Sequence, residues 1–161
     1  MWQHAARALP SFVLAGLGPR GLVSRVRRRV RLSETDFNMH MNQAAYAQVA
    51  EYGRNDWVLR SGLVRAFWRV RTKPVMAEQR IVYRRELKPG QRYTLDTRAT
   101  GIEGRLLKVD AHLIVDDRVH AAVYAKLISI GPDGVLSPEA ADALLSPFVT
   151  DPLPVEDWRV V

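Results

Sequence analysis

The sequence predicts an α+β domain in which one long helix packs on an antiparallel sheet of five to six strands. Residues 43–60 place apolar side chains at the three-to-four-residue spacing of an amphipathic helix. The chain after this helix consists mainly of short runs rich in Val, Ile, Leu and Tyr, separated by Gly, Pro and Asp turns. Such tight turns join antiparallel strands, and a helix laid on one face of an antiparallel sheet buries the apolar side of both.

Composition limits the classes of protein to which the chain can belong. It has 161 residues, of which 47% are apolar and 25% charged, as expected for a single globular domain. Because it contains no cysteine, a disulfide framework, a thiolate metal site and a cysteine nucleophile are excluded. A reducing compartment, the cytoplasm, is the expected location. No apolar run reaches the roughly 20 residues of a membrane-spanning helix.

Positive charge is concentrated near the N-terminus. The chain has 24 basic and 17 acidic residues, and residues 1–35 hold seven arginines and one acid, Glu34. We expect residues 1–22 to form an N-terminal arm, either packed on the protein or in peripheral contact with a membrane surface. A secretory signal peptide is the less favoured interpretation, because no clean cleavage site follows. The expected organisation is this arm, a domain over residues 23–146, and an extended tail over residues 147–161.

A first strand is predicted over residues 26–32 because apolar and basic residues alternate there. Val26, Val30 and Leu32 share one face, whereas Arg27, Arg29 and Arg31 share the other. The exposed arginines form either a solvated strand face or a seat for phosphate groups. Nucleic acid is not expected as a partner, since aromatic residues do not interleave with the basic run.

The long helix has clear start and stop signals. Asn42 is a favourable N-cap, and Gly62 is suited to ending the helix. Its apolar stripe includes small residues, which would let the helix approach a sheet closely: Ala45, Ala50 and Gly53.

The remaining strands are predicted from apolar runs between turn residues. They cover residues 66–75, 77–87, 91–100, 105–115 and 118–130. Ser137 and Pro138 then begin a short helix that ends near Leu145.

One polar cluster stands out as a candidate site. Asp36, Asn38, His40 and Asn42 occur at every second position, so an extended backbone would place all four side chains on one side. A carboxylate and an imidazole beside a helix N-terminus can hydrolyse a carbonyl compound, the helix end holding an oxyanion. The alternative is a loop whose polar side chains bind its own backbone. His112 and His120 lack metal-ligand spacing and are expected to be structural.

The same cluster belongs to a longer pattern. Thr35-Asp36-x-Asn38-x-His40-Met41-Asn42-x-x-x-Tyr46, followed by Glu51-x-x-Arg54, resembles the helix-entry motif of hotdog-fold thioesterases. The most similar branch contains the 4-hydroxybenzoyl-CoA thioesterase-like proteins. The segment is also similar to the catalytic segment of plant acyl-ACP thioesterases, as is Tyr83-Arg84-Arg85-Glu86. The resemblance extends over residues 25–130.

The resemblance implies an acyl-CoA or acyl-carrier-protein thioesterase that forms a homodimer or homotetramer and uses no metal or other cofactor. It implies Asp36 as general base or nucleophile, with Asn38 and His40 holding water. Asn42 would cap the helix whose first amides, from Gln43 onward, bind the thioester oxygen. Glu51 matches a helix carboxylate that is catalytic in another branch, but here it is expected to pair with Arg54. An acyl pocket would draw on side chains that otherwise serve as core: Phe37, Met39, Tyr46, Val49 and Trp57.

One departure keeps a second function open. The plant enzymes carry a glutamate just before the Tyr-Arg-Arg-Glu stretch, where this chain has Val82. A protein that binds acyl-CoA or a lipid-linked ligand without cleaving it is therefore the main alternative. A hydratase that pairs His40 with Asp36 and a nucleic-acid-binding protein are the less favoured ones.

Overall fold

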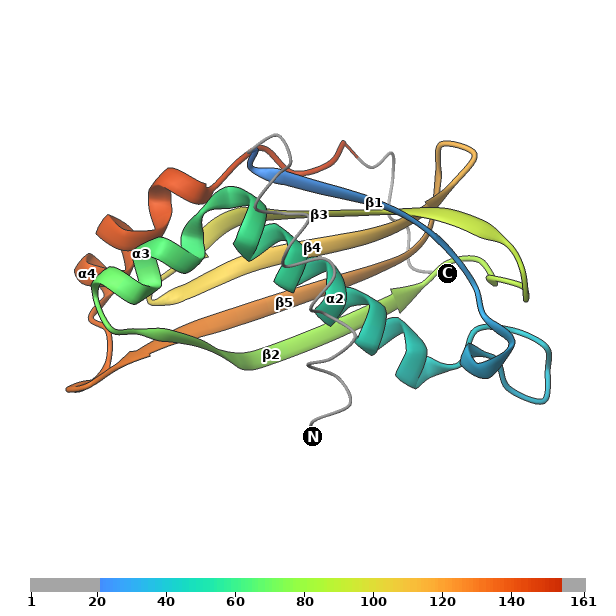
Figure 1. The fold of residues 1–161 in the computed structure, drawn as a ribbon, viewed down its shortest axis with the longest axis horizontal. Helices are drawn as coiled ribbons and strands as arrows, with labels where there is room; N and C mark the ends of the chain where they lie inside the picture. Colours follow the sequence, from blue (N-terminus) through green and yellow to red (C-terminus); the bar gives the residue numbers. More distant parts are fainter. Residues whose placement is uncertain (1–20, 155–161) are drawn as a thin grey trace.

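The structure, a computed structural model, describes residues 21–154. A curved antiparallel sheet is covered on one face by helices (Figure 1). The sheet strands are β1 (Val23–Arg29), β2 (Lys73–Tyr83), β3 (Arg92–Glu103), β4 (Leu106–Val115), β5 (Arg118–Gly131) and β6 (Gly134–Val135). The helices are α2 (Gln43–Ser61), α3 (Leu63–Arg69) and α4 (Pro138–Leu145), with 3-10 turns η1 (Leu32–Glu34) and η2 (Ser146–Phe148). This arrangement confirms the predicted α+β architecture.

The sheet order is β1-β3-β4-β5-β2, with the short β6 paired to β5. The strands β3, β4 and β5 follow one another as hairpins, whereas β1 and β2 lie at the two edges. β1 alternates as predicted where it overlaps the expected strand: Arg27 and Arg29 are exposed, whereas Val26 is partly covered. The predicted bounds, residues 26–32, are wrong, because β1 ends at Arg29 and Leu32, expected on the inner face, begins η1 and is 70% exposed. Because β2 precedes β3 in the chain but lies beyond β5, the chain must cross the sheet between them, and residues 84–91 make this crossing.

The long helix α2 crosses the concave face of the sheet and lies very close to β3. Asn42 caps its start, the side chain accepting a hydrogen bond from the Ala45 N–H at 2.9 Å. Gly62 ends it in the left-handed conformation, at a φ of 80°. A Cβ atom at Gly53 would lie 2.8 Å from Leu95 Cδ2 and closer still to Thr97 Oγ1. A glycine is therefore required at position 53, one of the small residues from which the sequence predicts a close approach of helix and sheet.

Polar contacts fix α2 to the neighbouring edge strand. The buried Asp56 carboxylate accepts a hydrogen bond from Ser24 Oγ of β1 at 2.5 Å. It also forms an ion pair with Arg60, one turn further along α2, whose Nε lies 2.6 Å away. Trp57, which is fully buried, donates its indole N–H to the Leu22 carbonyl at 2.9 Å. These contacts satisfy polar groups that would otherwise be costly to bury.

Two apolar clusters fill the space between helices and sheet. One lies under the first half of α2 and includes Tyr46, Val49 and Leu87. The other lies under its second half, where α3 and α4 pack, and includes Trp57 and Leu145. The predicted core roles of Tyr46, Val49 and Trp57 are confirmed.

One predicted strand is wrong. Residues 66–75 do not form a strand, because Leu63–Arg69 is the helix α3 and β2 begins only at Lys73. Leu63 and Phe67 are one helical turn apart and both are buried against the second cluster, which favours a helix over an extended chain.

Two further segments bear on the sequence predictions. The region expected to be an extended tail starts with the 3-10 turn η2, after which Val149 bridges to Ala99 of β3. Residues 1–20 and 155–161, which include nearly all of the expected N-terminal arm, lie outside the described residues. Among residues 21–154, no helix is long and apolar enough to cross a membrane.

Candidate functional site

The candidate site is built where the loop before α2 meets the segment after β2. The main-chain N–H of Met41 donates to the Leu87 carbonyl at 2.8 Å, which joins these two parts of the chain. The N–H groups of Arg84 and Arg85 both donate to the His120 carbonyl, at 2.9 and 3.0 Å. His120 also donates from Nδ1 to the Glu86 carbonyl at 3.0 Å. His120 thus has a structural role, holding the segment in which Glu86 lies.

Residues 35–41 form a tight loop, so the expected extended backbone is wrong here. Thr35 and Met41 pair as a bridge, and the Asp36 N–H donates to the His40 carbonyl at 3.0 Å. Met39 takes the left-handed conformation, with a φ of 58°. The alternation of side chains that an extended chain would give is lost because the loop reverses direction within these residues.

The Asp36 carboxylate caps this loop. Its Oδ1 accepts hydrogen bonds from the main-chain N–H of Asn38 at 2.9 Å and of His40 at 3.4 Å. Its Oδ2 has no partner among the described residues and is available to a water molecule or a ligand. The carboxylate therefore has a structural contact on one oxygen and an open oxygen for chemistry.

Asp36 and His40 line the same cavity, which has a volume of about 310 Å³. The other lining residues come from the start of α2 and from the segment after β2: Met41, Gln43, Tyr46, Tyr83, Arg84, Arg85 and Glu86. His40 Nε2 lies 2.8 Å from Glu86 Oε2, so a carboxylate orients the imidazole. Glu86 was not assigned a role from the sequence, although it belongs to the Tyr-Arg-Arg-Glu stretch that carries the resemblance.

The start of α2 contributes a positive electrostatic end to this cavity. Gln43 is the first helical residue and lines the cavity. The first amides of a helix have no acceptor within the helix, and they carry its positive dipole end. Asn42 does not line the cavity but caps the helix behind it.

Tyr46 closes the apolar side of the cavity. Its ring packs edge-on against Tyr83 at a centroid distance of 5.0 Å. Burial, reinforced by the neighbouring Tyr83, raises the pKa of Tyr46 to about 12. The phenol is therefore neutral at physiological pH.

Several expected site residues lie elsewhere. Phe37 is fully exposed and Met39 is 53% exposed, so neither is core and neither lines the cavity. Val49 lies in the core below Tyr46, and the Asn38 side chain is exposed outside the cavity lining.

The expected pair between Glu51 and Arg54 is also wrong. Glu51 is exposed on α2, and no ion pair joins it to Arg54 in the described part of the chain. Arg54 instead donates from Nη1 to Gln79 Oε1 of β2 at 3.1 Å. Burial lowers the pKa of Arg54, and the charge of Glu51 partly offsets this effect.

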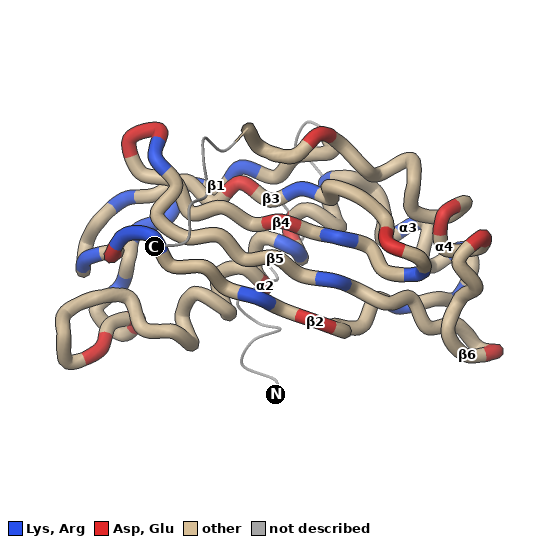
Figure 2. Tube along the Cα trace, turned by 180° about the vertical axis from the view of Figure 1, so that it is seen from behind, with Lys and Arg blue, Asp and Glu red and all other residues tan. Residues whose placement is uncertain are grey.

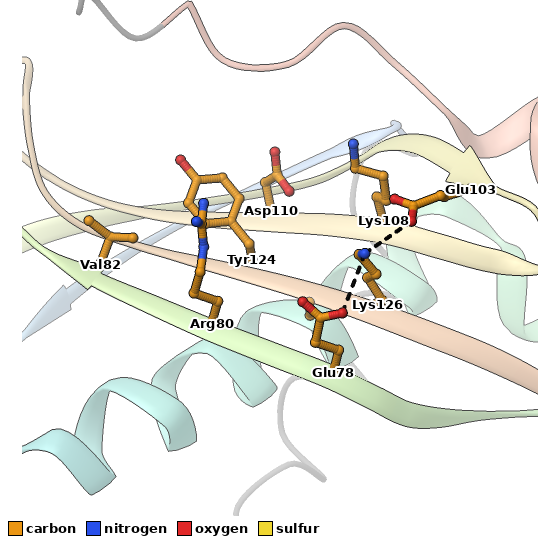
Figure 3. A pocket seen from close by; sticks show the side chains of 9 residues that line it. Glu78, Arg80, Val82, Glu103, Lys108, Asp110, Tyr124 and Lys126 are labelled. Atoms are coloured by element: carbon orange, nitrogen blue, oxygen red, sulfur yellow. Dashed lines mark hydrogen bonds and ion pairs between the residues drawn. The ribbon is translucent and has the colours of Figure 1, made fainter. Parts of the chain in front are cut away.

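A larger cavity of about 600 Å³ lies on the sheet face away from α2 (Figure 3). Figure 2 shows the sheet from this side, with basic and acidic residues along its strands. Its charged side chains largely neutralise one another: Lys126 lies between Glu78, at 3.3 Å, and Glu103, at 3.2 Å. Arg80 packs over the Tyr124 ring at 5.1 Å. Because no helix end and no open catalytic pair among residues 21–154 reaches this cavity, the site beside Asp36 is the stronger candidate. Across residues 21–154, no cluster of three or more His, Asp or Glu side chains is arranged to hold a metal ion.

Solved structures share this fold over most of the chain. The probable thioesterase YbaW from Escherichia coli superposes with a TM-score of 0.71 at 19% identity, covering 78% of this chain and 98% of its own. The protein SAV2348 from Staphylococcus aureus, determined in complex with CoA, gives a TM-score of 0.69 at 16% identity, covering 88% of this chain and 92% of its own. At these identities the likeness concerns the fold, which is the hotdog fold.

Sequence comparison gives the family. Protein THEM6 from Xenopus laevis is 31% identical over 107 residues, which are 64% of this chain and 52% of THEM6, so the match spans about half of that relative. Residues 30–148 match the family model of the thioesterase-like superfamily. This range includes the loop with Asp36, the helix α2 and every strand of the sheet except β1. The chain therefore belongs to the thioesterase-like superfamily.

Proposed function

We propose that the protein hydrolyses an acyl-CoA thioester to a free acid and a thiol at the cavity beside Asp36. The observation that carries this proposal is the open Oδ2 of Asp36 in a cavity shared with the His40–Glu86 pair and the start of α2. Family membership supports a thioester substrate, and CoA bound to the similar SAV2348 supports CoA as its thiol part. An acyl-carrier-protein thioester is the second form of the same substrate.

The proposed reaction uses residues of this chain only. Asp36 takes a proton from a water molecule, and the oxygen of that water attacks the thioester carbonyl carbon. The amides at the start of α2 stabilise the oxyanion that forms on the carbonyl oxygen. The carbon–sulfur bond then breaks, and the thiolate accepts a proton from Asp36 or from solvent. His40, oriented by Glu86, positions the water and substrate. Asn38 contributes through its main-chain N–H, which fixes the Asp36 carboxylate.

Arginines and tyrosines of the cavity fit the two ends of such a substrate. Arg84 and Arg85 place positive charge beside the reacting groups, where the phosphates of CoA can bind. Tyr46 and Tyr83 offer an apolar wall to the acyl group.

A homodimer is part of this proposal. The edge strand β2 is exposed from Lys73 to Arg80, and it has a neighbour on only one side. Such an edge invites pairing with another strand, and two copies related by a twofold axis can pair β2 with itself antiparallel. A homotetramer would be a dimer of such dimers. The lack of cysteine suits a reducing compartment, and we propose the cytoplasm.

A non-catalytic acyl-CoA-binding protein is the alternative. It is favoured by the structural role of Asp36, whose Oδ1 caps its own loop whether or not the carboxylate reacts. The two functions predict different results with the same ligands, since a binding protein would hold acyl-CoA without releasing CoA.

The test is thiol release from a panel of acyl-CoA esters, short to long and aryl. Because the chain has no cysteine, a thiol-reactive dye reports only released CoA. We expect release with at least one class of ester. Tight binding of an acyl-CoA without release across the panel would instead support the binding protein.

A further inference from the structure

The short helix α3 presents an unusual exposed surface. Its inner face buries Leu63 and Phe67 in the core, whereas Trp68 on the opposite face is 85% exposed. Val64 lies one turn before Trp68, and Arg65 and Arg69 lie one turn apart beside them. These four residues, which we call the α3 surface, line a shallow depression of about 410 Å³. A large exposed aromatic side chain in such a depression marks a contact surface.

The charge around the α3 surface is of one sign. Residues 57–77 contain five basic residues and no acidic one. Arg60 forms an ion pair with Asp56. Within the described residues, the other four basic side chains form no ion pair: Arg65, Arg69, Arg71 and Lys73. The acids of α4, Glu139 and Asp142, lie on a neighbouring helix but pair with none of them. The cationic charge therefore remains available to a negatively charged partner.

We propose that the α3 surface binds an anionic phospholipid membrane. The amphipathic indole ring is well suited to the interface between headgroups and acyl chains. Arginines beside it attract anionic headgroups and remain hydrated at the surface. An acidic protein partner would match the charge, but a single exposed Trp beside two arginines without ion pairs in the described part of the chain suits a fluid anionic surface better. This binding is independent of the proposed hydrolysis.

The position of the α3 surface allows binding without blocking the candidate site. α3 follows the C-terminal end of α2, whereas Asp36 and His40 lie before its N-terminal end (Figure 1). A 19-residue helix separates the two ends by about 28 Å. A protomer docked through α3 would therefore keep its cavity open to substrate.

The experiment is sedimentation of the full-length chain with vesicles of phosphatidylcholine alone or with 30% phosphatidylserine, at about 0.1 M salt. Three proteins are compared with the unaltered chain: Trp68→Ala, the double variant Arg65→Gln/Arg69→Gln, and the control Arg27→Gln/Arg29→Gln. The control removes the same charge from exposed positions of β1. All of these side chains are exposed, so the fold should persist in every variant. Circular dichroism and thiol release are recorded for each variant to verify this.

We expect binding only to vesicles that contain phosphatidylserine. Each basic side chain near an anionic surface changes the partition coefficient about fivefold, so Arg65→Gln/Arg69→Gln should weaken binding about 25-fold and the control far less. Trp68→Ala should weaken it at least ~10-fold.

Three results would overturn the proposal. Equal binding by all four proteins would place the membrane contact elsewhere in the chain. Absence of binding to any vesicle would remove the membrane as partner. Loss of dimer mass or of thiol release in Trp68→Ala would make the α3 surface a contact with a second copy.

Discussion

The contact between His40 Nε2 and Glu86 Oε2 joins two segments that are far apart in the sequence, at a distance of 2.8 Å. Glu86→Gln keeps the shape of the side chain but removes its charge. The loss of one charge-assisted hydrogen bond, worth about 1.5 kcal/mol, should lower kcat for thioester hydrolysis about tenfold. The measurement is steady-state thiol release. Glu51→Gln is the matched control, because Glu51 is exposed on α2 outside the cavity, and an equal effect in both variants would contradict the role of Glu86.

The sequence predicts only some of the residues that come together in the candidate site. Asp36 and His40 could be found because they belong to one motif, and Asn42 because N-caps have a local signature. The exposed positions of Phe37 and Met39 could not be predicted from the sequence. They depend on a reversal of the chain and on the left-handed conformation of Met39, which no periodicity reveals. Glu86 could be found only through the resemblance, because its approach to His40 depends on the crossing of the chain from β2 to β3.

The close contact between α2 and β3 gives a prediction at the scale of elements. In an exposed helix interior, Gly→Ala usually stabilises by up to about 1 kcal/mol. Here Gly53→Ala should destabilise the protein by about 2 kcal/mol, because the new Cβ would overlap Leu95 and Thr97. Urea unfolding measures the change. Gln48→Ala, on the exposed side of α2, should be close to neutral, and a stabilised Gly53→Ala variant would show that the two elements can separate without cost.

The elements themselves differ in how far the sequence predicts them. α2 and the three strands β3, β4 and β5 have strong periodicity and turn signals, and they form within a few residues of the predicted bounds. The sequence wrongly predicts a strand in place of α3, because Phe67, Trp68 and Val70 favour strands locally. What decides its helical form is tertiary packing of Leu63 and Phe67 on the second core cluster, which local propensity does not contain.

The stability of the whole molecule should depend on pH through His112. Burial, the largest cause, lowers the pKa of His112 to about 4, with Arg98 adding to this effect and Asp96 opposing it. The folded pKa lies below the ordinary value of about 6.5, so the unfolded chain binds the proton more readily. The contribution of neutral His112 is complete above pH 6.5 and is lost as the pH falls towards 4, up to about 3 kcal/mol.

Unfolding with urea at several pH values tests this dependence. The free energy of unfolding should fall between pH 6.5 and 4 more steeply for the wild type than for His112→Gln. The comparison with His112→Gln is needed because burial also raises the pKa of Asp110. Protonation of Asp110 makes the free energy of unfolding rise as the pH falls, which opposes the effect of His112. Parallel pH profiles of the two proteins would contradict the assignment to His112.

The assembly of the molecule gives a further prediction at this scale. Light scattering after size exclusion should give about twice the chain mass of 18.2 kDa, or four times it for a dimer of dimers. Met76→Asp, which places a charge on the exposed edge strand, should shift the protein towards the monomer. A monomer mass for the wild type at all concentrations would contradict pairing through β2.

Hydrolysis at Asp36 is tested most directly by measuring the turnover of an acyl-CoA ester by the wild type and Asp36→Asn side by side. The asparagine Oδ1 can still accept the N–H groups of Asn38 and His40, so the loop should persist while the base is lost. We expect kcat to fall at least ~10²-fold with little change in thermal stability. Unchanged turnover in the variant would contradict it.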